Sequence, residues 1–240
     1  MSKFPIKISP CPIIETNIEI RFIPNFPPDA VIGVIYSTLS RRGKCSLIQR
    51  NVMQLPSIVR MEDGRLKYQP THTISTSECL VHVGPFVAII QPSGKDYPGW
   101  GKYREIIDDI ISLFRQINLV KQIDSIGLKY INFFEFDIFD QINVSIKGLP
   151  TPLHSTVFRT ELKNDKFVNI LQITNGIHVK NPFFEKDGSL IDITTAILAN
   201  QGLTMENIMT RIEDAKNGEK ELFFSLLKKD YLNTLSPEYE

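Results

Sequence analysis

Histidines and carboxylates are the side chains of this chain with the greatest capacity for acid–base chemistry or metal binding. The four histidines stand far apart, in segments that have the composition of strands or loops: His72, His82, His154 and His178. No two of them have the i, i+4 spacing that a metal site on a helix uses. The sequence therefore predicts no metal site and no catalytic histidine, unless folding brings distant histidines together.

The other residues that could do chemistry also lack a catalytic pattern. Asp108 and Asp109 are adjacent within an expected helix, and nothing in the pattern indicates the burial that raises a carboxyl pKa. Cys11, Cys45 and Cys79 lack the paired spacing of a zinc or redox site, so we expect reduced thiols. Phosphate loops of the GxxxxGK[ST] and GxGxxG types are absent. We expect no cofactor, and the balance favours a protein that is not an enzyme.

Basic residues are concentrated in the first part of the chain. Residues 1–67 contain ten Lys or Arg against five Asp or Glu, although the whole chain has 27 of each kind. The densest group follows an expected helix and consists of Arg41, Arg42 and Lys44, with Arg50 close behind. Either this loop contacts phosphates, or it is a solvated basic loop favoured by the dipole at a helix C-terminus. Arg41 and Arg42 are therefore candidate binding residues.

An aromatic group surrounds the start of a second expected helix. Trp100 is the only tryptophan, and it stands between Tyr97 and Tyr103, beside Gly99 and Gly101. Glycines at a helix entrance can expose backbone N–H groups to an anion. The simpler interpretation is that the aromatic rings fasten the helix to a sheet. Trp100 and Tyr103 are candidate binding residues in the first case and structural residues in the second.

The segment IDSIGLKYINFFE, residues 123–135, predicts a long interior strand. Strict alternation puts two sets of side chains on opposite faces: Ile126, Leu128, Tyr130 and Asn132, and then Gly127, Lys129, Ile131 and Phe133. We expect Tyr130 to lie with one face in the core. Lys129 shares its face with apolar residues, which requires an opposite charge, a sheet edge or an anionic ligand near its ammonium group. Lys129 and Tyr130 complete the candidate binding residues.

The elements that position these residues follow from periodicity and from proline and glycine breaks. Period-two alternation predicts a strand at 17–22, and helical spacing of apolar residues predicts helices at 28–41 and 102–118. Short β-like runs lie between the two helices, at 50–55, 66–74, 79–83 and 86–91.

The second part of the chain is richer in strand patterns. Strands of a second antiparallel sheet are predicted at 123–136, 141–147, 155–163, 167–174 and 177–179. Asn175-Gly176 predicts a two-residue hairpin between the last two strands. Residues 190–199 fit either a further strand or the start of a helix. A final helix is expected to begin near Thr204, and Gly218 is a candidate kink within it.

These elements predict an α+β fold with mixed, largely antiparallel sheets, built from two strand–helix–strand halves and a long C-terminal helix. The first half is residues 1–122, and the second, β-rich half with the final helix is residues 123–240. The architecture we favour is a shared sheet that fuses the two similar halves, which could then form one domain. With 42% hydrophobic residues, the 240-residue chain is apolar and long enough to bury a core.

Charge and hydropathy disfavour several classes of protein. The formal net charge is +0, so the global field gives no reason to expect a dedicated DNA-binding protein. No segment approaches the ~20 consecutive apolar residues that span a bilayer. The first residues have no sustained apolar stretch like that of a secretory signal. We expect a soluble, cytoplasmic protein with no membrane partner.

Four segments resemble an uncharacterised, sporadically distributed bacterial family of similar length. They are the PxxE-type opening PIIETNIEIRF, the helix entry YPGWGKY, the strand IGLKYINFFE, similar to the family's RxGLRYxNxI, and the end EKELFFSLLKKDYLNTLSPEYE. Ser125 and Lys129 stand where that pattern tends to have Arg. The family has no established activity. The resemblance implies an accessory gene product, since sporadic distribution is common among toxin–antitoxin and phage-defence genes.

Two hypotheses on function follow. The first is a non-catalytic binding or regulatory protein that acts through a protein partner or as a homodimer. Adaptable or large side chains on the final helix suit such an interface: Met205, Met209, Phe223 and Phe224.

The alternative is an RNA-binding or RNA-processing protein on a ferredoxin-like sheet. In that hypothesis His72 or His154 acts as general acid or base. The phosphate contacts come from the basic residues named above: Arg41, Arg42, Lys44 and Arg50.

Overall fold

The computed structural model describes residues 4–145, 155–180 and 185–239. The first part of the chain contains β1 (Ile13–Pro24), η1 (Pro28–Ala30), α1 (Val31–Arg42), β2 (Ser46–Gln49), η2 (Asn51–Gln54), α2 (Ser57–Glu62), β3 (His72–Ser75), β4 (Cys79–Gly84), β5 (Val87–Pro92) and α3 (Trp100–Gln116). The second part contains β6 (Val120–Phe134), η3 (Ile138–Gln141), β7 (Val157–Lys163), β8 (Val168–Lys180), β9 (Glu185–Leu198), η4 (Ala199–Gln201), α4 (Ile208–Leu226) and α5 (Lys229–Thr234).

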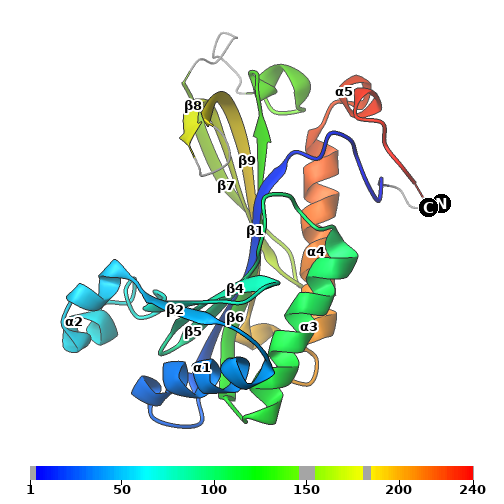
Figure 1. Cartoon of the computed structure of the whole chain (residues 1–240). Helices are drawn as coiled ribbons and strands as arrows, with labels where there is room; N and C mark the ends of the chain where they lie inside the picture. The colour runs from blue at the N-terminus through cyan, green and yellow to red at the C-terminus, as the bar shows by residue number, and fades with distance from the viewer. Residues whose placement is uncertain (1–3, 146–154, 181–184, 240) are drawn as a thin grey trace.

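All described strands belong to one nine-stranded sheet, in the order β2-β3-β4-β5-β1-β6-β9-β8-β7. Every neighbouring pair is antiparallel. The sheet twists strongly along its width, so that β2–β5 are turned relative to β7–β9 (Figure 1). The long strands β1 and β6 pair at its centre and connect the two ends.

The core lies between one face of the sheet and three helices. Alternation along β1 buries Ile18, Ile20 and Phe22 on that face, and α1, α3 and the first part of α4 cover them. A second apolar cluster lies towards β8 and β9, where the end of α4 packs with residues 134–142 and α5. Figure 1 shows α3 and α4 side by side, and Arg115 of α3 donates to the carbonyl of Met205 just before α4. One face of the sheet therefore carries the core.

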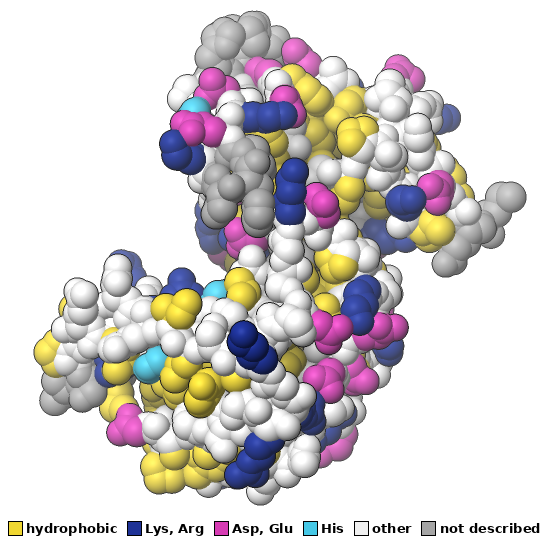
Figure 2. Space-filling model, viewed as in Figure 1, with side chains coloured by type: hydrophobic (Ala, Val, Ile, Leu, Met, Phe, Trp, Pro, Cys, Tyr) yellow, Lys and Arg dark blue, Asp and Glu magenta, His cyan; other side chains and the backbone are white. Residues whose placement is uncertain are grey.

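Polar side chains that alternate with the core residues along the strands point to the opposite face of the sheet, which is called the open face below. Glu19 and Arg21 of β1, Lys129 of β6 and Asp192 of β9 lie there, and each is half-buried. Basic and acidic side chains are interspersed on the surface that Figure 2 displays, which agrees with the zero net charge. Among the helices of the described residues, none is both long and apolar enough to cross a lipid bilayer.

The predicted α+β class with largely antiparallel pairing is confirmed. The described strands share one sheet, as the favoured architecture predicts. The prediction that the later strands form a second sheet is wrong, because β6 pairs with β1 on one side and with β9 on the other. The boundary between residues 122 and 123 falls inside β6. The organisation in two similar halves stays a prediction. The final helix α4 has 19 residues.

Two strand predictions in the first part are wrong. Residues 51–54 form the short helix η2. In the run 66–74 only residues 72–74 belong to a strand, which is β3 and ends at residue 75. The Asp63 carboxylate accepts hydrogen bonds from the N–H groups of Arg65 and Leu66, so the chain turns there. The strand β2 and the helix α2 were not expected, because both are short and weakly periodic.

In the second part the predicted hairpin at Asn175-Gly176 is wrong. A single strand, β8, runs through both residues, and a register shift against β9 between Asn175 and Ile177 absorbs the extra residue. Residues 190–198 belong to the strand β9, and residue 199 begins the short 3-10 helix η4. In the predicted strand 141–147, Ile142 makes only an isolated bridge with Leu227; residues 146 and 147 lie outside the described residues.

The final helix α4 begins at Ile208, four residues after the expected start at Thr204. It is one continuous element through Gly218, which was the candidate kink. Gly218 is instead required by packing, because a Cβ built there would lie 2.7 Å from Cε1 of Phe167. The glycine therefore lets the aromatic ring from the β7–β8 turn contact the helix backbone.

We expect Gly218→Ala to destabilise the protein by ~1–3 kcal/mol through overpacking, although alanine is the better helix former by ~1 kcal/mol. Gly33→Ala is the matched control, since Gly33 is exposed within α1 and a Cβ there meets no atom within 4 Å. That control should be stabilising. Chemical denaturation of both variants measures the effect, and equal shifts in one direction would contradict the packing role of Gly218.

Candidate functional site

The aromatic group at the start of α3 fastens the helix to the sheet. Tyr103 is fully buried, and its hydroxyl donates to the carbonyl oxygen of Ile90 on β5 at 2.8 Å. Trp100 packs edge-on against Tyr103 at 6.1 Å between ring centroids, and its Nε1 donates to Glu213 of α4 at 3.1 Å. The packing interpretation is confirmed by these contacts. A binding role for Trp100 or Tyr103 stays a prediction.

Tyr130 lies in the core, as expected from alternation along β6. Its hydroxyl is 3.2 Å from that of Tyr97, and the ammonium group of Lys216 lies 4.6 Å from its ring centroid. Lys216 in turn forms an ion pair with the buried Glu219 at 2.7 Å. Burial raises the pKa of both tyrosines well above the ordinary range. This cluster is a satisfied set of polar contacts under the helices.

Lys129 lies on the other face of β6 from Tyr130, and its Nζ pairs with Asp192 of β9 at 3.0 Å. Of the three alternatives stated for Lys129, the structure shows the opposite charge, and a binding role for Lys129 stays a prediction. The arginines after α1 lie elsewhere: Arg42 binds both carboxylate oxygens of Asp109 on α3, and Arg41 is exposed. The structure therefore brings Trp100 and Tyr103 into contact but does not gather the six candidate residues into one site.

The histidines do not converge in the described part of the chain. His82 bridges three strands, since its Nδ1 lies 2.9 Å from Oγ1 of Thr73 and its Nε2 lies 3.3 Å from Oε1 of Gln91. His178 contacts Asp187 and Glu185 near the end of β8. His154 lies outside the described residues. No group of three or more His, Cys, Asp or Glu side chains among those described is arranged to hold a metal ion.

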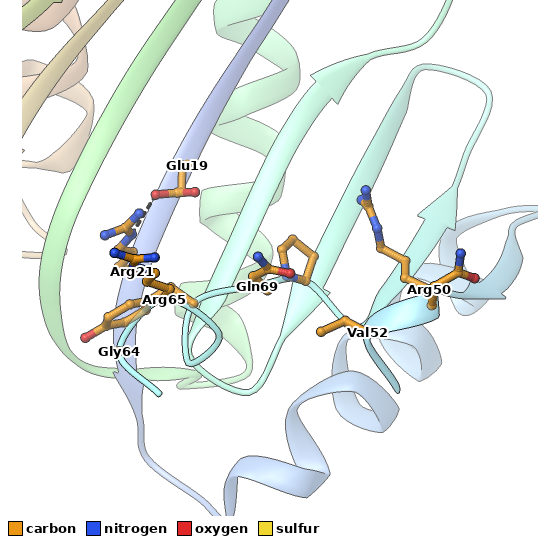
Figure 3. Close-up of a pocket in the computed structure, with 10 residues that line it drawn as sticks. Glu19, Arg21, Arg50, Val52, Gly64, Arg65 and Gln69 are labelled. Atoms are coloured by element: carbon orange, nitrogen blue, oxygen red, sulfur yellow. Dashed lines mark hydrogen bonds and ion pairs between the residues drawn. The ribbon is translucent and has the colours of Figure 1, made fainter. Parts of the chain in front are cut away.

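A broad cavity of about 940 Å³ lies over the open face near β1, and it is called the arginine pocket here. Its lining comes from β1, from the start of η2 and from the turn before β3: Glu19, Arg21, Arg50, Asn51, Val52, Gly64, Arg65, Tyr68, Gln69 and Pro70. In Figure 3, Arg21 and Arg65 lie towards one end and Arg50 lies at the other, with Gln69 between them. The three arginines come from segments that are far apart in sequence.

Backbone hydrogen bonds hold the two walls of the pocket against the sheet. The N–H of Arg50 donates to the carbonyl of Thr71, and the N–H of Thr71 donates to the carbonyl of Val83 on β4, both at 2.8 Å. Thr71 is buried, so these bonds are shielded from water. At Gly84 a Cβ would lie only 2.7 Å from the carbonyl oxygen of Gln69. The absence of a side chain there lets the turn approach β4.

The pocket has an excess of positive charge, with three arginines and one carboxylate in its lining. Glu19 is engaged by Arg21, whose Nε lies 2.6 Å from Oε1 of Glu19. The guanidinium of Arg21 also lies over the ring of Tyr68, at 4.8 Å from its centroid. Among the described residues, no carboxylate lies within ion-pair distance of Arg50 or Arg65. Two guanidinium groups are thus available to an anion.

The charge of Arg50 also acts on a neighbouring histidine. Burial lowers the pKa of His82, and the positive charge of Arg50 lowers it further, against the opposing hydrogen bond from Gln91. The surroundings of His82 therefore favour the neutral form of this histidine.

The candidate residues from sequence missed most of this pocket. Of the four residues predicted to contact phosphates, Arg50 lines the pocket, whereas Arg41, Arg42 and Lys44 lie outside the lining. The usable signal was the excess of basic residues over residues 1–67, because Arg21, Arg50 and Arg65 all belong to that set. The convergence itself depends on the turn before β3, which periodicity did not predict.

Comparisons with known proteins leave the chain without a family. No protein-family model matches it, and no curated protein matches it. A solved structure described as "KH domains" is similar over 90% of this chain, with 7% sequence identity and a TM-score of 0.22. This chain spans 63% of the length of that solved chain. A likeness this weak supports no statement on fold or function.

The pH dependence of stability should report the environment of His82. Its folded pKa is lowered, so its contribution is present above the ordinary value of ~6.5 and is lost as pH falls through the folded pKa. We expect the free energy of unfolding of His82→Gln to fall less steeply than that of the unmodified chain between about pH 7 and pH 5.

His178→Gln provides a control of opposite sign. Hydrogen bonds to Asp187 and Glu185 raise the pKa of His178, so this residue contributes stability at low pH that the variant lacks. Its unfolding free energy should fall more steeply on acidification. Urea denaturation across the pH range measures both slopes, and identical slopes for the two variants would contradict the assignment.

Proposed function

We propose that this chain is a binding protein whose arginine pocket holds phosphates of a single RNA strand. The observation that carries the proposal is the pair of guanidinium groups, from Arg50 and Arg65, without a carboxylate partner among the described residues around a cavity of about 940 Å³. Arginine presents a planar fork of donors that matches phosphate oxygens. The proposal develops the RNA hypothesis at residues other than the basic loop.

The spread of the arginines favours a ligand with several phosphates. Arg50 stands at the other end of the pocket from Arg21 and Arg65 in Figure 3. A single phosphate at one end would leave the charge at the other end unmatched. A strand with a repeating phosphate backbone can engage both ends.

Binding rather than reaction is the better match to the lining. The described lining residues include no histidine, cysteine or lysine, and the carboxylate of Glu19 is engaged by Arg21. Tyr68 is covered by the guanidinium of Arg21, so its ring is already in a cation–π contact. We infer recognition of backbone phosphates without base selection by stacking.

The protein-partner hypothesis remains a second proposal, together with the toxin–antitoxin or phage-defence association implied by the resemblance. The observation that favours a partner is the strand β7 at the edge of the sheet, whose sequence VFRTELK is complementary to itself in the antiparallel direction. Regulation through such a partner is compatible with an RNA-binding pocket, because the two places lie at different ends of the sheet.

The first test uses a short fluorescently labelled oligouridylate at several salt concentrations. We expect affinity to fall as salt rises, and Arg50→Gln or Arg65→Gln to weaken binding and reduce the slope of log K against log[salt] by ~0.7 each. Arg41→Gln is the matched control, since this arginine is exposed and outside the pocket. Fluorescence anisotropy measures all four proteins.

Absence of binding at low salt would exclude the proposal. An equal loss from Arg41→Gln would move the contact to the basic loop after α1. Tight binding of tripolyphosphate that excludes the oligouridylate would indicate a small phosphorylated ligand instead of a strand.

A second test removes the acid in the pocket. Glu19→Gln deletes the carboxylate and releases Arg21. Removal of a negative charge from a partly solvated pocket should favour a bound phosphate by ~1 kcal/mol, so affinity for the oligouridylate should rise roughly fivefold. The matched control is Asp109→Asn, which releases Arg42 outside the pocket. Anisotropy titrations at one fixed salt concentration compare the two, and an equal rise in both would show a non-specific charge effect.

A further inference from the structure

The strand β7 ends the sheet, and among the described residues no strand pairs with its outer side. Two large apolar side chains are exposed on it, Val157 at 66% and Leu162 at 45%. An exposed edge with these features is a template for pairing with another strand. The opposite edge, β2, has four residues and no charged side chain.

The backbone groups that face outward from β7 can be identified from its pairing with β8. The N–H of Asn175 donates to the carbonyl of Thr156, and the N–H of Asn164 donates to the carbonyl of Phe167, so even-numbered residues direct their backbone groups towards β8. Backbone direction alternates along a strand. Hydrogen-bonding groups of Val157, Arg159, Glu161 and Lys163 therefore point to the free side.

The sequence of β7, VFRTELK, is complementary to itself in the antiparallel direction. Centred on Thr160, a second copy places Arg159 opposite Glu161 and Phe158 opposite Leu162. Arg159 and Glu161 share the open face and already form an ion pair within the chain at 3.2 Å. Each would gain a cross-strand partner of opposite charge, and both belong to the outward-facing residues.

Charge also selects this register over its neighbours. When two identical strands pair antiparallel, residues that are paired directly have their side chains on the same face of the sheet. The register between the two strands can therefore shift only by two residues at a time. Centring on Arg159 places that arginine opposite itself, and centring on Glu161 places that carboxylate opposite itself. Like charges directly opposite are destabilising. The register centred on Thr160 alone among these three pairs opposite charges.

We propose that two copies of this chain form a homodimer by antiparallel pairing of β7 with β7, centred on Thr160. The two-fold axis is perpendicular to the joined sheet, so both open faces lie on the same side. The arginine pocket lies towards the other end of the sheet and stays uncovered in each copy. The dimer does not depend on the proposed function, although two pockets on one side would increase avidity for a long strand.

A charge exchange tests the dimer. Sedimentation equilibrium of the full chain should show a concentration-dependent dimer. Arg159→Glu and Glu161→Arg each place like charges opposite one another at two symmetry-related positions, and we expect each to weaken the dimer ~10-fold or more. The double variant Arg159→Glu/Glu161→Arg exchanges the charges and should restore the dimer.

A second variant separates pairing from the ion pair within the chain. Val157→Lys puts a like charge opposite Lys163 of the second copy and leaves the Arg159–Glu161 pair intact, so the dimer should again weaken while the thermal midpoint of the monomer stays unchanged. A monomer at every concentration, or a dimer that all three single variants leave intact, would overturn the proposal.

Discussion

The antiparallel pairing of β1 with β6 is the contact on which the rest of the structure depends. Its register places Ile18 opposite Leu128 and Ile20 opposite Ile126, and all four side chains are buried under the helices. Burial of each such side chain contributes roughly 1.5–3 kcal/mol. The pair joins the first strand of the chain to one formed after α3, so the outer strands add to either side of this centre. Without it the sheet would separate into two incomplete sheets, each with an exposed edge.

The same alternation that buries this core places charged side chains on the open face, and most of these charges form ion pairs with other side chains of the sheet. Lys129 pairs with Asp192, and Arg21 pairs with Glu19. Arg50 and Arg65 come from loops laid over this face, where strand alternation supplies no partner. Hydrogen bonds through Thr71 hold those loops in place. The arginine pocket is thus a consequence of anchoring basic loops above a polar sheet face.

Local patterns were sufficient where one face of an element is buried. The apolar stripe of α3 and the two faces of β6 around Lys129 and Tyr130 agree with prediction. A helix or strand with one buried face must repeat its apolar residues with a period of 3.6 or 2 residues, and this repeat is visible in the sequence. Prediction failed at residues 50–55 and at Asn175-Gly176. The first run has no neighbouring strand to pair with, and at the second the long partner β9 stabilises a continuous strand over a locally favoured hairpin.

Composition and the periodicity within single segments predicted the α+β class, the long central strand and the excess of basic residues before β3. Contacts between distant segments set the order of the described strands in their sheet, bring Arg21, Arg50 and Arg65 to one pocket, and leave β7 at an edge. These features depend on contacts between segments distant in sequence. The free energy of such a contact depends on both surfaces, so the sequence of one segment does not show which other segment it will contact.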